Sequence, residues 1–324
     1  MTTIKDVANE AKVSVGSVSR YLNGYELKKD NRISIERAIK KLNYIQNQTA
    51  KSLKMNKSFS IGVIVDTMDN FYSSQLIASL ERLLDKNNYF LLLASHHDNE
   101  KMFNYKLSKL IERSVDGLII VKANQEWTAI EKLKDMVLPV IAVEVPLDKK
   151  IPSVISDDKD ATKQVISWLL SKNKKMGFII PSERDYVLRH RLMGIEEAYT
   201  KHNKLVMSNQ VAFAEYGTDD AYYQTKRLLN SGVRALFITN YVNAVLAVKA
   251  IQDSNKILGK DVLLASFGYS DLFEKLNLPI TIIKQSINDV SQATVDILLN
   301  LLIDKEVALT TRKIIVDDIL WDKK

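Results

Sequence analysis

The chain has 324 residues and contains no cysteine. This absence excludes disulfide bonds, a thiol nucleophile and thiolate metal ligands, and it suits a reducing cytosol. The N-terminus has no apolar leader, and no part of the sequence reaches the roughly 18 uninterrupted apolar residues that a membrane span needs. We therefore expect a soluble, cytoplasmic protein that makes no use of a membrane.

Signatures of catalysis are lacking as well. The sequence has no Gly-x-Ser-x-Gly, P-loop or Gly-x-Gly-x-x-Gly motif that would support hydrolase, nucleotide or dinucleotide chemistry. Among the four histidines, the neighbours His96 and His97 stand next to Asp98, but they lack the spacing that is typical of a metal site. We expect no enzyme, no cofactor and no bound metal.

The chain does have a basic N-terminal segment on a neutral body. Residues 1–60 hold twelve Lys and Arg against five Asp and Glu, whereas the other 264 residues hold 34 of each. The formal net charge of +7 at pH 7 therefore comes entirely from this segment. A local excess of cations on short helices is typical of a DNA-binding domain.

Two short helical patterns separated by a tight break open the basic segment. The first has one buried face formed by Ile4, Val7, Ala8 and Ala11. Ser14 offers an N-cap to the second, which starts at Val15 and buries Val18 and Leu22. Its outward face is formed by Ser17, Ser19 and Arg20. A polar helical face of this kind can enter the major groove of DNA.

A third helix is predicted further along, with Ser34 as its N-cap and Glu36 in its first turn. Its buried face would be formed by Ile35, Ala38, Ile39 and Leu42. Because three helices this short share only a small core, we expect the domain to be marginally stable on its own.

An ordered set of short stretches runs through the basic segment. They are Thr3–Ala8, Val13-Ser14, Ser17–Arg20, Leu22–Gly24 and Leu42–Tyr44, followed by Asn47, Ala50 and Leu53. In sequence and order they resemble the lactose-repressor (LacI/GalR-type) family of bacterial transcription regulators. The resemblance implies that Val15 and Gly16 stand at the two main specificity positions and that Arg20 contacts a base, for which guanine is the natural partner. The DNA-binding residues that it implies are Thr3, Ser14, Val15, Gly16, Ser17, Ser19, Arg20, Asn23, Tyr44, Asn47, Ala50 and Leu53.

Four positions leave alternatives open or depart from the family pattern. Val15 lies three residues before Val18, and the alternative is that it belongs to the core. For Gly16 the alternative is that it only accommodates the backbone and touches nothing. Lys12 stands where the family usually has Gly in the turn, a change that costs about 1 kcal/mol if the residue is left-handed. Gln46 replaces a Pro that commonly precedes the hinge, so the hinge begins less rigidly.

Residues 47–55 form the predicted linker. These nine residues are too few for a stable isolated helix, which needs roughly 12–15 residues in water. The resemblance implies that the segment becomes helical only on the operator, where Leu53 wedges into the minor groove and bends the duplex. The alternative is a disordered tether with Leu53 packed on the body.

From Ser60 onward the pattern changes to α/β. Apolar runs that predict buried parallel strands lie at 61–65, 90–94, 117–121, 139–143, 176–180, 233–238 and 262–265. Amphipathic helical stretches lie around 72–87, 100–113, 126–135, 186–201, 219–231 and 241–254. Two doubly wound subdomains are implied, with a ligand cleft between them at the carboxyl ends of their strands.

The body resembles the same family more weakly. The stretches that carry this resemblance are Asp69–Tyr72, Val115–Gly117, Arg191–Gly194 and Phe267–Asp271. They imply the fold of the type I periplasmic sugar-binding proteins. The predicted domains are a helix-turn-helix head at 1–46, a hinge at 47–59 and an effector-binding and dimerisation domain at 60–324. The subdomains of the last are about 60–157 plus 288–312, and 158–285 plus 313–324.

The resemblance also places an effector site. Arg191 matches the family Arg that holds a polar group of the ligand, with a surface helix charge as the alternative. Asn240 matches an Asn at the cleft, whereas Tyr241 replaces the usual Asp, and Ser270 competes with Asp271 for the position of the family's ligand Asp. The predicted effector-binding residues are Phe71, Glu144, Arg191, Asn240 and Asp271; Phe71 and Glu144 follow strands and would contact a sugar ring. We expect a sugar, with a sugar phosphate or a nucleobase as alternatives.

Together these features predict a transcriptional repressor controlled by a small molecule. Its partners would be double-stranded operator DNA, the effector and a second copy of the chain. We expect a dimer and not a tetramer, because the sequence has no appended heptad helix that would pair two dimers. Effector binding would change cleft closure and hinge placement, so that both Leu53 wedges no longer fit together. One alternative is a global catabolite-type regulator that needs a protein corepressor. The other, a sugar-binding transport protein, predicts a secretory leader and no basic head.

Overall fold

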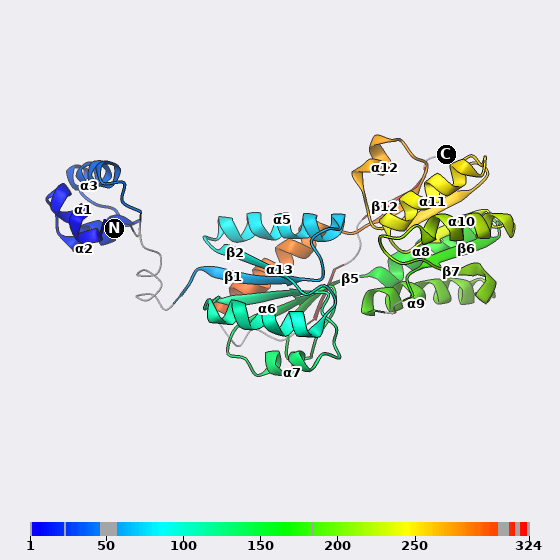
Figure 1. The fold of residues 1–324 in the computed structure, drawn as a ribbon, viewed down its shortest axis with the longest axis horizontal. Coiled ribbons are helices and arrows are strands. Elements are labelled where there is room, and N and C mark those ends of the chain that lie inside the picture. The colour runs from blue at the N-terminus through cyan, green and yellow to red at the C-terminus, as the bar shows by residue number, and fades with distance from the viewer. Residues whose placement is uncertain are drawn as a thin grey trace. The chain divides into compact units, whose positions relative to one another are not determined.

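The computed structural model describes residues 2–22, 24–45, 57–182, 185–303, 311–314 and 318–322, with the backbone alone for 311–314. The chain forms two compact units, one within residues 1–58 and the other within residues 59–324 (Figure 1). The predicted linker 47–55 lies outside the described residues. Asn23, Asn47, Ala50 and Leu53 lie outside them too, and their roles on DNA stay predictions.

The described part of the first unit is a head with three helices, drawn in blue in Figure 1. Its helices are α1 (Ile4–Ala11), α2 (Val15–Leu22) and α3 (Lys29–Lys41). The buried residues of its core are Val7, Ala8, Ala11, Val18, Ile35 and Ala38. At the start of α1, Thr3 Oγ1 accepts the N–H of Asp6 at 3.3 Å, and Asp6 Oδ2 accepts the backbone N–H of Thr3 at 2.8 Å. These reciprocal bonds satisfy two backbone donors that a helix start leaves free.

The start of α3 corrects one prediction. The helix begins at Lys29, so Ser34 lies inside it and is not its N-cap. The additional turn places Asp30 near the positive end of the helix, which favours an acidic residue. Glu36 is consequently in the middle of the helix, where its carboxylate accepts a hydrogen bond from Arg32 at 2.8 Å.

Lys12 occupies the tight turn between α1 and α2. Its φ of 53° is left-handed, as expected of the position where the family usually has Gly. A residue with a Cβ pays roughly 1–2 kcal/mol in this conformation. The backbone N–H of Lys12 still bonds to the carbonyls of Ala8 and Asn9, so the turn closes despite the side chain.

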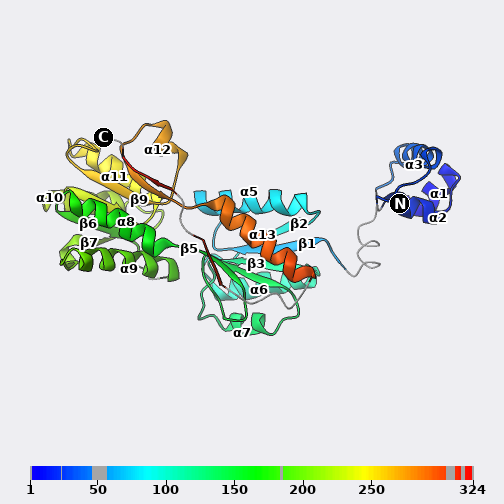
Figure 2. The same cartoon turned by 180° about the vertical axis from the view of Figure 1, so that it is seen from behind.

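The second unit contains two lobes, each a sheet covered by helices on both faces (Figures 1 and 2). Lobe 1 has the strand order β11-β5-β4-β3-β1-β2, with all neighbours parallel. Its strands are β1 (Ser60–Val65), β2 (Phe90–Ser95), β3 (Gly117–Val121), β4 (Val140–Val143), β5 (Ser153–Ser156) and β11 (Thr311–Ile314). Its helices are α5 (Phe71–Lys86), α6 (Glu100–Glu112), α7 (Thr128–Lys134) and α13 (Ile287–Ile303). Ile61 and Val63 pack with α5 and α13, whereas Ile64 packs with α6 and α7 on the other face.

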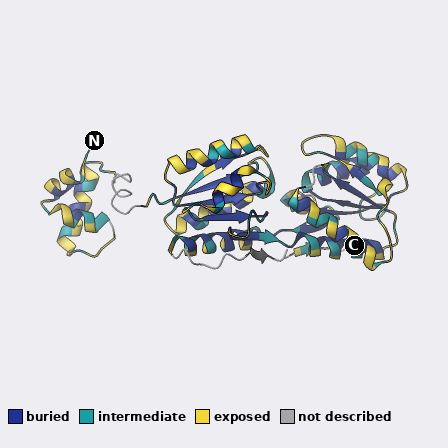
Figure 3. Cartoon of the chain, turned by 90° about the horizontal axis from the view of Figure 1, so that it is seen from below, coloured by how far each residue is buried: buried dark blue, intermediate teal, exposed yellow. Residues whose placement is uncertain are grey.

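Lobe 2 has the strand order β12-β10-β9-β8-β6-β7, in which only β12 runs antiparallel to its neighbour. Its strands are β6 (Met176–Ile180), β7 (Val211–Phe213), β8 (Ala235–Ile238), β9 (Leu263–Phe267), β10 (Thr281–Lys284) and β12 (Asp318–Leu320). Its helices are α8 (Asp158–Ser171), α9 (Tyr186–Lys201), α10 (Asp220–Asn230), α11 (Tyr241–Asp253) and α12 (Asp271–Lys275), with a 3-10 turn at Ser208–Gln210. α8 and α9 cover one face, and α10 and α11 cover the other. Figure 3 shows the buried strands between helices with exposed outer faces.

The predicted fold class is confirmed. Every strand and helix predicted in the body is present, each within two residues of its predicted bounds. The described chain passes between the lobes from β5 to α8 and from β10 to α13, and of the two last strands β11 belongs to lobe 1 and β12 to lobe 2. β11 extends lobe 1 to residue 314, slightly beyond the predicted boundary at 312. Among the described residues, no helix is both long and apolar enough to cross a lipid bilayer.

Candidate functional site

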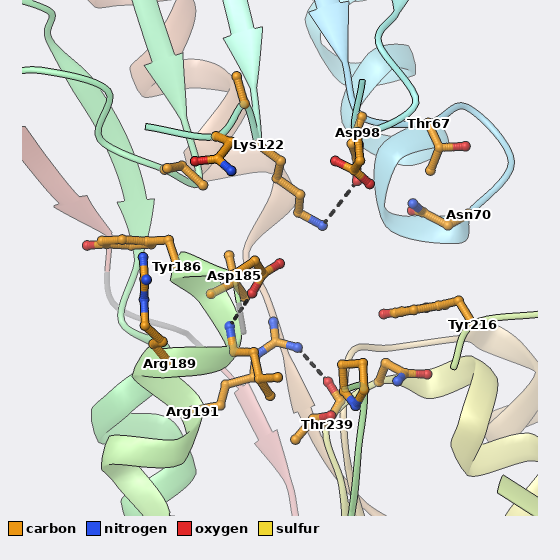
Figure 4. A pocket seen from close by; sticks show the side chains of 18 of the residues that line it. Thr67, Asn70, Asp98, Lys122, Asp185, Tyr186, Arg189, Arg191, Tyr216 and Thr239 are labelled. Carbon is orange, nitrogen blue, oxygen red and sulfur yellow. Dashed lines mark hydrogen bonds and ion pairs between the residues drawn. The ribbon is translucent and has the colours of Figure 1, made fainter. Parts of the chain in front are cut away.

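A cavity of about 520 Å³ lies between the two lobes. Its walls come from the segments that follow β1, β2, β3 and β4 in lobe 1, from those that follow β6, β7 and β8 in lobe 2, and from the first residues of α9. Parallel strands bring such loops together at the carboxyl edge of each sheet. The cavity therefore occupies the place where the sequence predicted a ligand cleft, and Figure 4 shows it from close by.

Lys122 follows β3 and extends from lobe 1 into the cavity (Figure 4). Its ammonium lies 3.8 Å from the carboxylate of Asp66, which follows β1. Burial lowers the pKa of Lys122, but Asp66 and Glu144 outweigh this effect and hold the pKa above its usual value. Lys122 is therefore charged, and the protein itself supplies the opposite charge.

Arg191 reaches the cavity from α9 of lobe 2. Its Nε lies 3.4 Å from the carboxylate of Asp158, its Nη1 donates to the carbonyl of Thr239, and its guanidinium lies 3.5 Å from the ring centre of Phe267. Only 11% of the side chain is exposed, which excludes the surface-charge alternative. Burial raises the pKa of Asp158 to about 7, against the opposing effect of Arg191.

The Arg-x-x-Gly spacing has a reason in helix packing. A Cβ at Gly194 would come within 2.4 Å of the carbonyl oxygen of Lys159 and 2.9 Å of the Cβ of Thr162, both on α8. Glycine thus lets α9 lie directly on α8. Because Arg191 precedes this contact by about one helical turn, the close approach brings its guanidinium to Asp158 at the start of α8.

Asn240 lines the cavity at the start of α11. Its side-chain oxygen accepts the N–H of Asn243 at 2.8 Å and so caps the helix. The side-chain Nδ2 is buried and has no hydrogen-bond partner among the described residues. A buried unpaired donor costs roughly 1–3 kcal/mol, which an acceptor atom on a ligand would recover.

The cavity lining is richer in carboxylates than in cations. Its acidic residues are Asp66, Asp69, Asp98, Glu126, Asp185 and Glu215, and its basic residues are Lys122, Arg189 and Arg191. Two of these three cations already have carboxylate partners within the protein. Its aromatic residues are Trp127, Tyr186 and Tyr216. Donors, acceptors and rings in one cavity match a ligand with several hydroxyl groups.

Glu144, a predicted effector residue, does not line this cavity. Its carboxylate is buried and accepts hydrogen bonds from the hydroxyl of Tyr72, from Ser156 at 3.3 Å and from Gln285 at 3.3 Å. Ser156 and Gln285 belong to segments that lead from one lobe to the other. Glu144 therefore ties two of the connections between the lobes to β4.

Phe71 and Asp271 do not line the cavity either. Phe71, at the start of α5, packs edge-on against Tyr241 and Tyr269 of lobe 2. Asp271 starts α12, is half exposed and pairs with Lys275 at 2.7 Å. Ser270, which competed with Asp271 as a ligand residue, caps α12 and does not line the cavity either. Of the five predicted effector residues, Arg191 and Asn240 are the two that the structure brings together around the cavity.

His96 is a core residue in the wall behind the cavity. Its Nδ1 accepts the N–H of Asp98 at 3.0 Å, its Nε2 lies 3.3 Å from the carbonyl oxygen of Val121, and its ring meets Trp127 edge-on at 5.0 Å. Burial lowers the pKa of His96. The described residues include no group of three or more His, Cys, Asp or Glu that could hold a metal ion.

Most residues that line the cavity were not predicted from the sequence. A signal was present for Asp66 and Lys122, because each directly follows a predicted strand. Tyr216 and Asp185 come from loops around β7 and α9, and β7 is too short to stand out as an apolar run. Trp127 reads as one more apolar residue of a helical stretch until the fold places it at the cavity.

The second helix of the head exposes the residues predicted to read DNA. Val15 is 42% exposed, so it does not belong to the core. A Cβ at Gly16 would meet only Ser14 Oγ at 3.6 Å, an ordinary contact, so packing within the head does not require glycine there. Arg20 is exposed, with its guanidinium 5.9 Å from the ring centre of Tyr25.

The other predicted DNA-binding residues of the head have structural partners. Ser14 Oγ accepts the N–H of Ser17 at 3.1 Å and caps α2, and the hydroxyl of Thr3 caps α1. Tyr44 is half buried against the core of the head, and Ser19 is half buried on α2. Contact of these residues with DNA stays a prediction.

Two family models match the chain. The model described as "Periplasmic binding proteins and sugar binding domain of LacI family" matches residues 58–298, and the model described as "Bacterial regulatory proteins, lacI family" matches residues 3–47. The HTH-type transcriptional repressor PurR of Haemophilus influenzae is 29% identical over 317 residues, covering 94% of this chain and 93% of the relative. Catabolite control protein A of Priestia megaterium is 24% identical over 302 residues, covering 91% of each chain.

Solved structures show the same architecture. The lac repressor dimer bound to operator and the anti-inducer ONPF superimposes with a TM-score of 0.86 at 23% identity, covering 99% of this chain and 98% of that one. The complex of the transcriptional regulator CelR with cellobiose gives a TM-score of 0.74 at 17% identity, with all of both chains covered. At 23% and 17% identity, these two structures show that the fold is shared, and nothing beyond the fold.

Proposed function

The chain belongs to the LacI family of bacterial regulatory proteins, and from this premise we propose that it represses transcription as a homodimer whose operator affinity falls when an uncharged sugar binds between its lobes. The observation that carries the proposal is the joining, in one chain, of an exposed recognition helix to a polar cavity between two lobes. A DNA-binding regulator of this kind acts in the bacterial cytoplasm, where its operator lies. It requires no catalytic activity.

The charge of the cavity supports a sugar without a phosphate. A phosphate group would enter a lining with six carboxylates, where Lys122 and Arg191 are already paired with Asp66 and Asp158. Placing like charges together disfavours binding. Hydroxyl groups, in contrast, both donate to carboxylates and accept from the unpaired Nδ2 of Asn240.

A thermal-shift screen tests the effector. Glucose, fructose, ribose, maltose and cellobiose are compared with the phosphate esters of the first three. A ligand that binds only the folded protein raises the melting temperature, and we expect such a rise with at least one free sugar and with none of the esters. Stabilisation by an ester alone would contradict the assignment of an uncharged ligand.

Operator release separates two modes of regulation. The proposed mode predicts that the sugar found in the screen lowers operator affinity of the purified protein in a gel shift, with no second protein present. If the sugar binds but leaves the DNA affinity unchanged until another protein is added, the chain is a regulator that needs a protein corepressor.

A substitution of Arg20 tests whether the head recognises the base sequence of DNA. On an operator selected from a random pool, Arg20→Ala should lose about 1–3 kcal/mol of specific affinity, the range for one base contact. The matched control, Arg37→Ala, removes an exposed cation from α3 and should weaken specific and random DNA binding equally. Equal losses on both kinds of DNA for Arg20→Ala would show that Arg20 contacts phosphates only.

A further inference from the structure

The two lobes meet on the α5 side of the cleft through a small aromatic cluster. The backbone N–H of Phe71 in lobe 1 donates to the hydroxyl oxygen of Tyr241 in lobe 2 at 3.0 Å. The ring of Phe71 meets Tyr241 and Tyr269 of lobe 2 edge-on, with centroid distances of 6.0 and 6.2 Å. Edge-to-face rings at these distances stabilise a contact by more than the burial of their apolar surface alone.

Helix geometry explains why this N–H is available to the other lobe. The first N–H groups of a helix have no partner within the helix. Asn70 caps α5 by accepting the N–H of Ser73 at 2.7 Å, and the N–H of Phe71 remains for Tyr241. Because Tyr241 begins α11, the bond joins the starts of two helices from different lobes. A hydroxyl oxygen is well placed at the positive end of α5.

The contact on the opposite side of the cleft is of another kind. Val187, at the start of α9 in lobe 2, is 6% exposed and packs with the core of lobe 1, together with Tyr186. Trp127 and Leu147 of lobe 1 belong to the same cluster. Apolar packing of this kind is non-directional, whereas the hydrogen bond to Tyr241 fixes one helix start relative to another.

We propose that Tyr241 and Phe71 form a clasp that sets the closure of the cleft. Tyr241 stands where the family usually has Asp, and here its hydroxyl is engaged by the other lobe. On the α5 side, the two lobes are thus held together by a contact within the protein and not by a bound ligand. An effector would bind between lobes that are already linked on that side. Tyr241 is a positioning residue for the proposed function, on which this inference rests.

The absence of cysteine permits a direct measurement of closure. Glu81→Cys on α5 and Gln252→Cys on α11 place one spin label on an exposed position of each lobe in the full chain. Double electron–electron resonance then reports the distance distribution between the lobes without any ligand. Tyr241→Phe keeps the ring and removes the hydroxyl, and we expect the ratio of closed to open molecules to fall roughly 2- to 10-fold, the effect of one neutral hydrogen bond.

Tyr223→Phe is the matched control, because Tyr223 is 65% exposed on α10 of the same lobe. It should leave the distances unchanged. Tyr241→Ala, which also removes the ring, should shift the distribution further, and its circular dichroism reports whether the lobes remain folded. Distances identical to those of the parent in both Tyr241 variants would overturn the clasp.

Adding each free sugar of the thermal screen to the labelled parent tests the proposed function separately. If no sugar changes the distances or the melting temperature while Tyr241→Phe still opens the lobes, the clasp stands and the sugar effector fails. If a sugar changes the distances and neither Tyr241 variant does, the sugar stands and the clasp fails.

Discussion

Replacing Gly194 by alanine tests how the cavity is held together. The added Cβ would lie 2.4 Å from the carbonyl oxygen of Lys159 and 3.1 Å from the backbone nitrogen of Lys163. Both atoms belong to the backbone of α8, so no side-chain rotation relieves the overlap. The helices α8 and α9 must therefore move apart.

The distances set the size of the effect. An ordinary contact needs roughly 1 Å more than the 2.4 Å available, and forcing an extra carbon into a packed interface costs about 1–3 kcal/mol. The same movement carries Arg191 away from Asp158, a pair that already stands at 3.4 Å. We expect lower stability of lobe 2 together with weaker binding of the sugar, while operator affinity without sugar stays the same.

Urea unfolding followed by circular dichroism measures the stability, and calorimetry with the sugar from the screen measures the binding. Met193→Ala is the control, because Met193 is 46% exposed on the same helix and its shortening leaves the α8 contact intact. An unfolding midpoint of Gly194→Ala equal to that of Met193→Ala would refute the packing argument. Lower stability with unchanged sugar affinity would show that Gly194 is needed for packing but does not position Arg191 for the sugar.

Three other substitutions test single features. Lys12→Gly should stabilise the head by about 1 kcal/mol, because glycine adopts a φ of 53° without strain; slower hydrogen exchange of the head amides measures this, and an equal gain with Lys12→Ala would contradict the reason. In the unmodified protein, Asp158 binds a proton more tightly in the folded than in the unfolded state, because folding raises its pKa from 3.8 to about 7. The stabilisation that this proton brings, up to about 4 kcal/mol, is therefore lost as the pH rises through this window. The urea midpoint should depend less on pH across this window in Asp158→Asn, and an unchanged pH dependence would exclude Asp158 as its source. Glu144→Gln should destabilise the protein by about 1–3 kcal/mol, because the amide turns an NH₂ group towards the donors around it; an unchanged melting temperature would show that the carboxylate bonds are dispensable.

The strands and helices were predictable where burial imposes a strong pattern. Strands buried on both faces need continuous apolar residues, so β1 and β3 stand out in the sequence. β5 has four residues, begins and ends with Ser, and leaves no such run. Ser34 was mistaken for an N-cap because its side chain suits that role, whereas the real start of α3 at Lys29 has no side-chain cap.

The candidate site was predictable only where local motifs carry it. Arg191 and Asn240 lie in recognisable stretches beside predicted elements, and both line the cavity. The partner of Arg191 could not be foreseen, because Asp158 meets it only through the packing of α9 on α8. Phe71 was expected to contact a sugar, and nothing in the sequence shows that Tyr241, 170 residues away, engages it.

The return of α13 to lobe 1 has a consequence for the order of folding. Apart from β12, the described part of lobe 2 lies within residues 158–284, and only afterwards does the chain return to bury Val290 and Leu298 of α13 against the sheet of lobe 1. Contacts that close a loop of this length form slowly. During synthesis the helices of lobe 2 can therefore form while one face of the lobe 1 sheet is covered by α5 but still lacks α13. The part of this face that α13 later buries is the surface that chaperones or aggregation would reach first.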